Sequence, residues 1–302
     1  STGRVRALPI IKPERHYVLK RTPLRRRSLL LALAAAGAAG GTFVWERRTR
    51  PRVHLWPDPD GPIHTLVPAF PSDFERRKVF VDPGHGAPDN PGNSSCVCQD
   101  EQDFTLSVAR SVARWLEGTG HFEVRLSRDN DERVLYAARV AAATAWGADV
   151  FLSIHSDIRG QTGETQLIGS QNVCRINLGA PGFSVLLSED GSESLVAARK
   201  KLARNTARRM REAGFGAYSG AEYGTLYAED AGEKGVFLDR HAHEQRIFVL
   251  WKPSMPSIIV ETHHALDPRE VRLWSLASTH TAFASVLAAA LVDTLANETN
   301  SH

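Results

Sequence analysis

The sequence predicts an α/β fold: a single domain with a mainly parallel, twisted sheet covered by helices on both faces. Short runs of apolar residues, typical of strands buried on both faces, recur from Lys78 to the end of the chain. Segments with the period of an amphipathic helix lie between these runs, and this alternation favours parallel strands. Several of the apolar runs end in His or Glu. In an open α/β sheet, ligands bind outside the carboxyl ends of the strands, so we expect the functional site at that edge.

The predicted strands are rich in Val, Ile, Leu and Phe. Residues 122–127 alternate between apolar and polar side chains, whereas 148–155 form an almost continuous apolar run. The predicted strands are 79–81, 122–127, 148–155, 182–188, 247–251 and 257–261.

The predicted helices follow a period of 3.6 residues and end at residues that terminate helices. Asp131 is expected to cap the second helix, and Gly214 to end the third. The predicted helices are 104–116, 131–146, 193–213 and 279–296. Residues 158–181 and 215–245 show no clear period, and we expect both to be irregular.

The charge of the chain is unevenly distributed. Of its 37 basic and 34 acidic residues, residues 1–52 hold 13 and 2, which leaves a net charge of −8 on residues 53–302. Proteins that bind nucleic acid usually carry a basic surface for the phosphate backbone. We therefore expect no nucleic-acid partner.

The basic segment has the organisation of an export signal. Arg25, Arg26 and Arg27 precede residues 29–45, which carry no charge, and this order is typical of a secretory signal. The arginines followed by Ser28 resemble the twin-arginine type. The uncharged run is also long enough for a marginal membrane span. We expect export to the periplasm or cell wall, with cleavage of the signal and anchoring of residues 29–45 in the inner membrane as alternatives.

Residues 53–76 are rich in Pro and Arg and show no period, which predicts a linker that lies along the domain. The export signal or anchor and the start of this linker then occupy 1–52, and the folded domain occupies 77–302. Three cysteines, Cys96, Cys98 and Cys174, fit no zinc-ribbon spacing. In an exported protein, one disulfide can join Cys96 or Cys98 to Cys174 and leave one thiol over.

Three predicted strands bring polar side chains to one edge of the sheet. One strand leads into His85, one ends at His155, and one ends at Glu261. Two imidazoles and a carboxylate suit a catalytic Zn²⁺ ion, which keeps an open position for water. Gly84 and Gly86 beside His85 would let the backbone turn tightly and approach the metal or substrate.

The residues alone leave the third ligand open. Glu261 is one choice, and Asp100, Glu101 and Asp103 at the start of the first helix are others. Acidic residues at that place also have a structural explanation, because carboxylates favour the N-terminus of a helix. If one of these acids binds the metal, Glu261 is free to act on the water.

The order of these motifs resembles that of the zinc-dependent N-acetylmuramoyl-L-alanine amidases. The resemblance covers roughly residues 77–295 and rests on "VFVDPGHG", the Glu101-Gln102-Asp103 helix start, "RLSRDND", "LYAARVAAATAWGADVFLSIHSD" and "MPSIIVET". It implies that residues 77–302 are a catalytic domain. It further implies one zinc ion per chain, bound by His85, Glu101 and His155 at the C-terminal ends of the strands, with Glu261 as the catalytic residue.

The resemblance assigns further residues less directly. Arg128 and Arg139 match family arginines that fix structure, and Arg128 is also a candidate for substrate contact. After Glu261 the family usually shows a small residue and then an aromatic residue, whereas this chain has Thr262, His263 and His264. We therefore include His263 and His264 among the candidate substrate contacts.

Two other positions depart from the family pattern. Trp251 stands where the family often has Arg, and 105 residues separate His155 from Glu261, which is longer than a compact relative needs. The additional residues fall in 158–181 and 215–245. We expect these segments either to be surface loops or to control access to the zinc.

The resemblance implies hydrolysis of the amide bond between N-acetylmuramic acid and L-alanine in peptidoglycan. Zinc would activate water, and Glu261 would carry its proton to the leaving amine. Peptidoglycan and a regulatory protein at the cell envelope are the expected partners, with membrane contact only through the N-terminal segment. A zinc exopeptidase and a catalytically silent peptidoglycan-binding regulator on the same fold are the alternatives.

Overall fold

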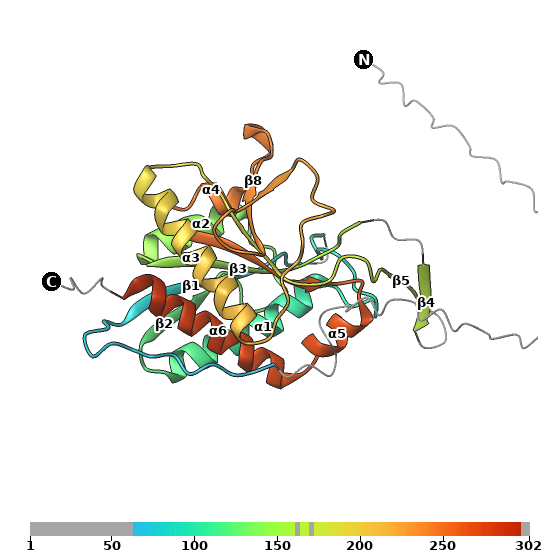
Figure 1. The fold of residues 1–302 in the computed structure, drawn as a ribbon, viewed down its shortest axis with the longest axis horizontal. Helices are drawn as coiled ribbons and strands as arrows, with labels where there is room; N and C mark the ends of the chain where they lie inside the picture. The colour runs from blue at the N-terminus through green and yellow to red at the C-terminus, as the bar shows by residue number, and fades with distance from the viewer. Residues whose placement is uncertain (1–62, 88, 161–163, 169–171, 297–302) are drawn as a thin grey trace, which may run out of the picture. The chain divides into compact units, whose positions relative to one another are not determined.

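The computed structural model describes residues 63–87, 89–160, 164–168 and 172–296 (Figure 1). The predicted export signal, its cleavage or anchoring, and the first part of the linker therefore lie outside the described residues. Within them, no single helix is long and apolar enough to cross a membrane. By length and composition alone, the pair Pro268–Trp274 and Ala277–Leu295, bent by 78°, could do so.

A seven-stranded sheet forms the centre of the domain, in the order β2-β1-β3-β9-β6-β8-β7. The strands are β1 (Arg77–Pro83), β2 (Phe122–Leu126), β3 (Val150–Asp157), β6 (Ser184–Leu187), β7 (Tyr227–Glu229), β8 (Val236–Asp239) and β9 (Ser257–His264). Strands β2, β1, β3 and β9 are parallel; β6 is antiparallel to β9 and parallel to β8, and β7 is antiparallel to β8. The predicted mainly parallel sheet is confirmed.

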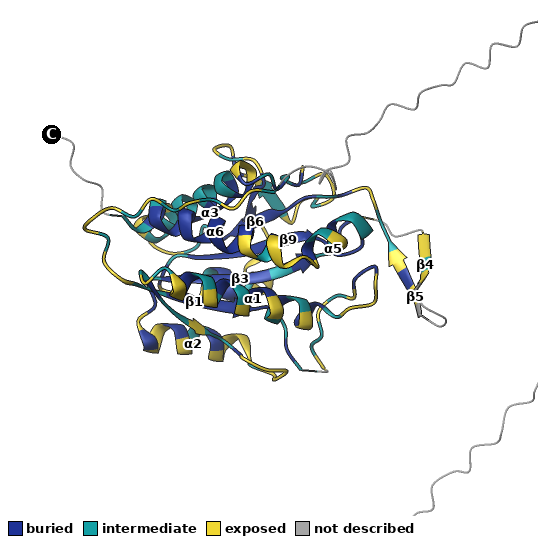
Figure 2. Ribbon diagram, turned by 90° about the horizontal axis from the view of Figure 1, so that it is seen from below, coloured by how far each residue is buried: buried dark blue, intermediate teal, exposed yellow. Residues whose placement is uncertain are grey.

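Helices cover both faces of this sheet. They are α1 (Glu101–Gly118), α2 (Tyr136–Trp146), α3 (Glu193–Glu212), α4 (Phe248–Trp251), α5 (Pro268–Trp274) and α6 (Ala277–Leu295), with a short 3₁₀ helix at His243–Gln245. Alternate strand residues point to opposite faces. On one face Val79, Leu152 and Val260 pack with α1, α3 and α6, and on the other Phe80 and Phe151 pack with α2 and α4. The central strands are accordingly buried along most of their length (Figure 2).

Some predicted elements differ in the structure. Residues 247–251 are not a strand, because Phe248–Trp251 form α4. A short apolar run does not distinguish a buried strand from a buried helix. Here the buried Arg199 side chain donates to the carbonyls of Trp251 (3.2 Å) and Pro253 (2.9 Å), at the end of α4. The prediction for Asp131 was also wrong, because α2 begins at Tyr136 and Asp131 accepts a hydrogen bond from the Ala87 amide.

Both segments expected to be irregular contain strands. Residues 158–181 include a hairpin of β4 (Glu164–Ile168) and β5 (Asn172–Ile176), which extends away from the main sheet in Figure 1. Residues 215–245 contribute β7 and β8 to the main sheet itself. All four residues of β8 are buried. The second segment is therefore part of the core and not a surface loop.

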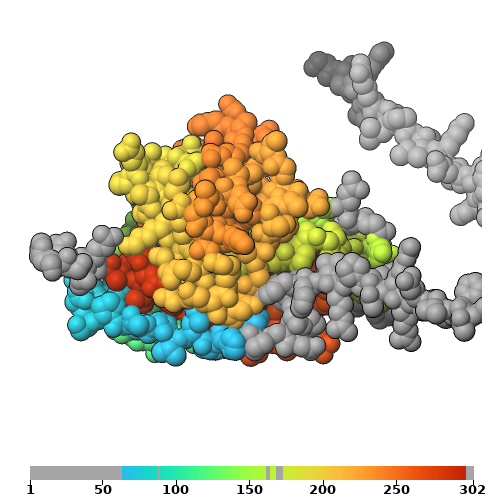
Figure 3. All heavy atoms as spheres, in the orientation of Figure 1, coloured from blue at the N-terminus to red at the C-terminus, as the bar shows by residue number. Residues whose placement is uncertain are grey.

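The described part of the predicted linker, residues 63–76, forms neither a helix nor a strand. Its apolar side chains nevertheless pack against the core: Ile63, Leu66, Phe70 and Phe74. The Leu66 amide donates to Ser285 Oγ on α6 at 2.9 Å, and in Figure 3 the blue start of the described chain lies against the red of α6. This segment lies along the domain, as the sequence predicts, and contributes to its packing.

Candidate metal centre and active site

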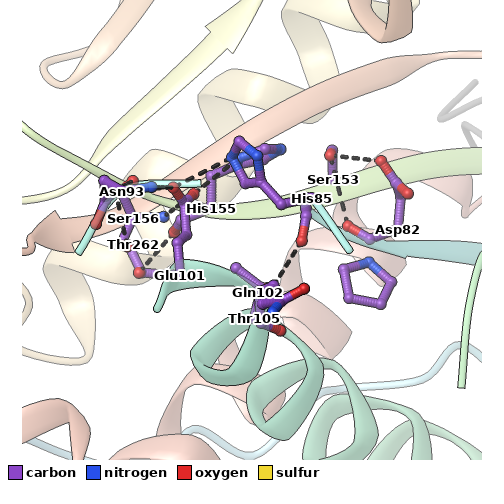
Figure 4. Close-up of polar contacts among 12 residues, drawn as sticks. Asp82, His85, Asn93, Glu101, Gln102, Thr105, Ser153, His155, Ser156 and Thr262 are labelled. Atoms are coloured by element: carbon purple, nitrogen blue, oxygen red, sulfur yellow. Dashed lines mark hydrogen bonds and ion pairs between the residues drawn. The ribbon is translucent and has the colours of Figure 1, made fainter. Parts of the chain in front are cut away.

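The structure brings His85, Glu101 and His155 together from three separate elements. His85 follows β1, Glu101 opens α1, and His155 lies near the carboxyl end of β3. Their ligand atoms lie within 4.8 Å of one another, and they form the only such group of three in the ranges that the structure describes. Glu101 lies between the rings, with Oε2 at 3.1 Å from Nε2 of His85 and Oε1 at 2.9 Å from Nδ1 of His155 (Figure 4).

The turn after β1 adopts a conformation that few sequences allow. His85 has φ 63° and Gly86 has φ 132°, both in the region that disfavours ordinary side chains. Gly84 is required for a different reason, because a Cβ there would lie 2.3 Å from the His155 ring. Gly84 thus allows the two histidines to approach each other, and Gly86 allows the turn that follows His85.

Hydrogen bonds orient the side chains of this cluster. The Oε2 atom of Glu101 accepts from Asn93 N (3.0 Å) and Nδ2 (2.8 Å), while Oε1 accepts from Ser156 N (3.0 Å). Nδ1 of His85 lies 3.1 Å from Oδ1 of Asn90. Donation by Nδ1 to this oxygen leaves Nε2 of His85 with a lone pair for a metal.

Burial and charge act in opposite directions on these groups. Burial would raise the pKa of Glu101, but hydrogen bonds from His155 and His85 and the charges of these residues hold it below its ordinary value. Burial would lower the pKa of His155, but its hydrogen bond to Glu101 raises the pKa overall. An ionised carboxylate shared by two imidazoles is a donor set that suits a divalent cation with nitrogen and oxygen ligands. The residues present therefore fit a zinc ion.

Glu261 lies beside this cluster on β9. It is paired with His155 on β3 and with Ser184 on β6. Its Oε2 is buried and has no hydrogen-bond partner among the described residues. Burial, followed by the negative charge of Asp157, raises the pKa of Glu261 to about 8. The candidate ligand cluster thus contains Glu101, and Glu261 lies outside it on the neighbouring strand.

The two arginines of the family pattern are buried and hold the turn after β1. Arg128 donates to the carbonyls of Gly84 and Gln102, both at 2.8 Å, and Arg139 pairs with Asp82 at 2.7 Å. All three guanidinium nitrogens of Arg128 bind backbone carbonyls. This placement argues against the predicted substrate contact by Arg128 and supports a structural role.

His263 and His264 are buried as well, because β9 contains a bulge. His155 pairs with Glu261 and Asp157 pairs with His264, so β9 has one extra residue in this interval. His263 is stacked on Trp274 with ring centroids 5.7 Å apart, and it lines a cavity of about 200 Å³ beside α1 and α5. His263 is 3% exposed and His264 is fully buried, which argues against the predicted substrate contacts.

Sequence reasoning missed several residues around Glu261. Asp157 Oδ2 accepts from Arg159 Nε at 2.8 Å and from the Tyr223 hydroxyl at 2.9 Å, and the Tyr223 hydroxyl lies 2.5 Å from Ser184 Oγ. Asp157 belongs to the "SIHSD" motif and could have been identified there. Tyr223 lies in 215–245, where no pattern pointed to a site. We refer to Asp157, Arg159, Ser184 and Tyr223 as the Asp157 network.

The disulfide is one of the two pairings that the sequence allowed. Cys98 and Cys174 form a disulfide, and Cys96 is a buried free thiol whose pKa burial raises to about 11. The disulfide joins the β4–β5 hairpin to the loop that precedes Glu101. Gln166 of the hairpin also donates to the Cys96 carbonyl at 2.7 Å.

The fold and the ligand cluster define a class: an α/β domain with a candidate metal centre at the carboxyl edge of its parallel strands. Comparison with known proteins identifies the family within that class. The N-acetylmuramoyl-L-alanine amidase family, Amidase_3, matches residues 79–293, and the chain belongs to this family.

Individual relatives resemble the chain over different lengths. N-acetylmuramoyl-L-alanine amidase CwlM of Bacillus licheniformis is 42% identical over 87 residues, which are 28% of this chain and 34% of the relative. Amidase AmiC of Neisseria meningitidis is 28% identical over 227 residues, or 69% of this chain and 50% of the relative. The chain thus spans between a third and a half of the length of these relatives.

Solved structures show the same fold. The amidase Ami1 from Mycobacterium smegmatis superimposes with a TM-score of 0.56 at 20% identity, over 74% of this chain and 99% of that one. At this identity the likeness shows the fold alone. The α/β architecture predicted from the sequence is therefore shared with an amidase catalytic domain.

Proposed function

We propose that this chain is a zinc-dependent amidase that hydrolyses the bond between N-acetylmuramic acid and L-alanine in peptidoglycan. The observation that carries the proposal is the His85, Glu101 and His155 cluster, with Glu261 paired to His155 on the neighbouring strand. Family membership supports the reaction, because the family and the relatives named above are N-acetylmuramoyl-L-alanine amidases.

His85, Glu101 and His155 would hold the zinc ion. Zinc supplies Lewis acidity, which activates water and polarises the scissile carbonyl. Asn90 and Asn93 orient the ligands through the hydrogen bonds described above. These residues prepare the site before substrate arrives.

Glu261 would accept the proton of the attacking water and deliver it to the leaving amine. Its environment suits both tasks, because a pKa of about 8 lies close to neutral pH, where a group can take up and release a proton. Its position is held by strands on both sides. Proton transfer of this kind typically contributes about 10²–10⁴-fold to a rate.

Peptidoglycan is the proposed substrate, and we propose an exported protein in the periplasm or cell wall. The twin-arginine-like segment and the apolar run of residues 29–45 support export. A regulatory protein at the cell envelope is proposed as a further partner. The mildly acidic residues 53–302 argue against a nucleic-acid partner.

The structure favours the amidase over the two alternatives. An exopeptidase would be expected to show further metal ligands or an arginine for a terminal carboxylate. The described residues contain no second ligand cluster, and Arg128 and Arg139 are engaged with the turn after β1. A catalytically silent regulator would be expected to have lost a ligand or Glu261, whereas all four residues are present and in place.

Product analysis tests the proposal. The zinc-loaded protein should release intact stem peptides from purified peptidoglycan and leave glycan chains with free lactyl groups, as identified by mass spectrometry. Removal of the metal with a chelator should stop release, and added zinc should restore it. Release of single amino acids would instead identify an exopeptidase, and binding without release would identify a silent regulator.

A further inference from the structure

The Asp157 network surrounds Glu261 from both neighbouring strands. Asp157 lies on β3, two residues beyond His155, while Ser184 lies on β6 directly opposite Glu261. Tyr223 connects them, because its hydroxyl donates to Asp157 Oδ2 and lies 2.5 Å from Ser184 Oγ. A single hydroxyl group thus joins β3 and β6, the two strands that flank β9.

Arg159 is the fourth member of the network and binds the Asp157 carboxylate. Its Nε donates to Asp157 Oδ2, and its Nη1 donates to the carbonyls of Gly182 (2.7 Å) and Ala180 (3.2 Å). The guanidinium also lies over the Tyr218 ring, 4.2 Å from its centroid. Arg159 is 3% exposed, so its partners are fixed by the surrounding packing.

The two strands that this network joins flank Glu261, which is paired with Ser184 on β6 and with His155 on β3, two residues before Asp157. Glu261 itself has an oxygen without a hydrogen-bond partner among the described residues. Its position therefore depends on how β3 and β6 are held on either side of β9.

We propose that Tyr223 is a positioning residue for Glu261, acting through Asp157 and Ser184. Tyr223 holds the Asp157 carboxylate against the Arg159 guanidinium. Through Ser184 it also keeps β6 in place opposite Glu261. Segment 215–245 thus contributes Tyr223 to the surroundings of Glu261. This inference rests on the proposed function, because it assigns Tyr223 a role toward the proposed general base.

Tyr223→Phe tests this role by removing one hydroxyl and keeping the ring. Loss of a hydrogen bond to a charged group should lower kcat about 10-fold or more, because Asp157 and Glu261 are then less well placed when the proton moves. KM should stay within about twofold, since Tyr223 is not proposed to bind substrate. Zinc content measured by atomic emission should equal that of the wild type.

Tyr218→Phe is the matched control. Tyr218 is a buried tyrosine of the same segment, and its hydroxyl accepts from the Glu222 amide but contacts neither Asp157 nor Ser184. This variant should lose comparable thermal stability and keep kcat within about twofold. A kcat of Tyr223→Phe equal to that of the control would overturn the proposal, as would a rise in KM with kcat unchanged.

A second variant keeps the test decisive if Tyr223→Phe folds poorly. Ser184→Ala leaves the Tyr223 bond to Asp157 intact and removes the hydroxyl that links Tyr223 and, at 3.4 Å, Arg159 to β6, so kcat should fall with KM unchanged. An unchanged kcat in Ser184→Ala would also contradict the proposed link. Failure of the proposed function looks different, because the wild type would then release no stem peptides and both proposals would fall together.

Discussion

His155 and Glu261 are paired on neighbouring parallel strands, and the Thr262 hydroxyl reinforces the pair by donating to the His155 carbonyl at 2.8 Å. Paired residues of parallel strands point to the same side of a sheet. A proposed metal ligand and the proposed general base are therefore held by backbone hydrogen bonds and not by a loop. Because each side chain has its own strand, either can be changed while the other stays in place.

His155→Ala should remove most of the zinc. The substitution removes one of the three proposed ligands. It also removes the imidazole that contacts Oε1 of Glu101. Metal content after dialysis should fall well below one zinc per chain, and activity should be lost with it. His243→Ala, which changes an exposed histidine, is the control; full zinc occupancy in His155→Ala would reject this ligand.

Glu261→Gln should keep zinc and the fold but lose most of the turnover. The amide has nearly the same shape as the carboxyl group but cannot carry a proton, so a loss of about 10²–10⁴-fold in kcat is expected. Peptidoglycan hydrolysis and metal content should be measured on the same preparation. Activity near that of the wild type would show that another group moves the proton.

The contribution of His263 to the free energy of unfolding should fall as the pH falls below about 6.5. Burial, followed by the charge of Arg159, lowers the pKa of His263 from 6.5 to about 3. Between these values the unfolded chain binds a proton that the folded chain does not, so unfolding is favoured as the pH falls, by at most about 1.4 kcal/mol per pH unit.

His263→Phe should reduce this dependence, because Phe keeps an aromatic ring beside Trp274 and cannot titrate. The measurement is denaturant unfolding of the metal-free protein at several pH values from about 4 to about 8, a range that covers the upper part of this window and the pH values above it. His264, whose pKa burial also lowers, accounts for part of the slope that remains. Identical slopes for His263→Phe and the wild type would mean that His263 is charged in the folded protein.

Two truncated chains should show that residues 63–76 stabilise the domain and that residues 1–52 do not. A chain that begins at Val53 keeps the packed segment 63–76 and should bind zinc and unfold at the same temperature as the full-length protein. A chain that begins at Arg77 loses Phe70 and Phe74, which pack around His121 and Phe122. Because burial of one such side chain contributes about 1.5–3 kcal/mol, its melting temperature should fall by several degrees. Equal melting temperatures would show that the segment adds no stability.

Cys174→Ser should lower the free energy of unfolding by about 2–5 kcal/mol, because it opens a cross-link between residues separated by 76 positions. Denaturant titration with and without a reductant is the measurement. Reduced wild type should behave like the variant, and reductant should have no effect on the variant itself. A variant as stable as the oxidised wild type would indicate that Gln166 and the hairpin packing suffice.

Local patterns in the sequence were sufficient to predict most of the sheet and the residues that meet at its candidate metal site. The apolar runs at 79–81, 148–155 and 257–261 predict β1, β3 and β9, because buried parallel strands need continuous apolar side chains. Their common carboxyl edge then places His85, His155 and Glu261 together. The resemblance of the motifs to the amidases selects Glu101 from the acids at the start of α1, and the structure places it between the two imidazoles.

Only the tertiary structure decided what the residues between His155 and Glu261 do. Strand β8 is too short to show a period, and it becomes a strand because β6 and β7 pair with it on either side. Tyr223 reaches Asp157 across 66 residues of sequence. His263 is buried because a bulge in β9 turns it toward Trp274. The pairing of β8 with β6, the Tyr223–Asp157 hydrogen bond and the pairing of β9 with β3 all join segments that are distant in the chain. A local sequence pattern cannot predict such contacts.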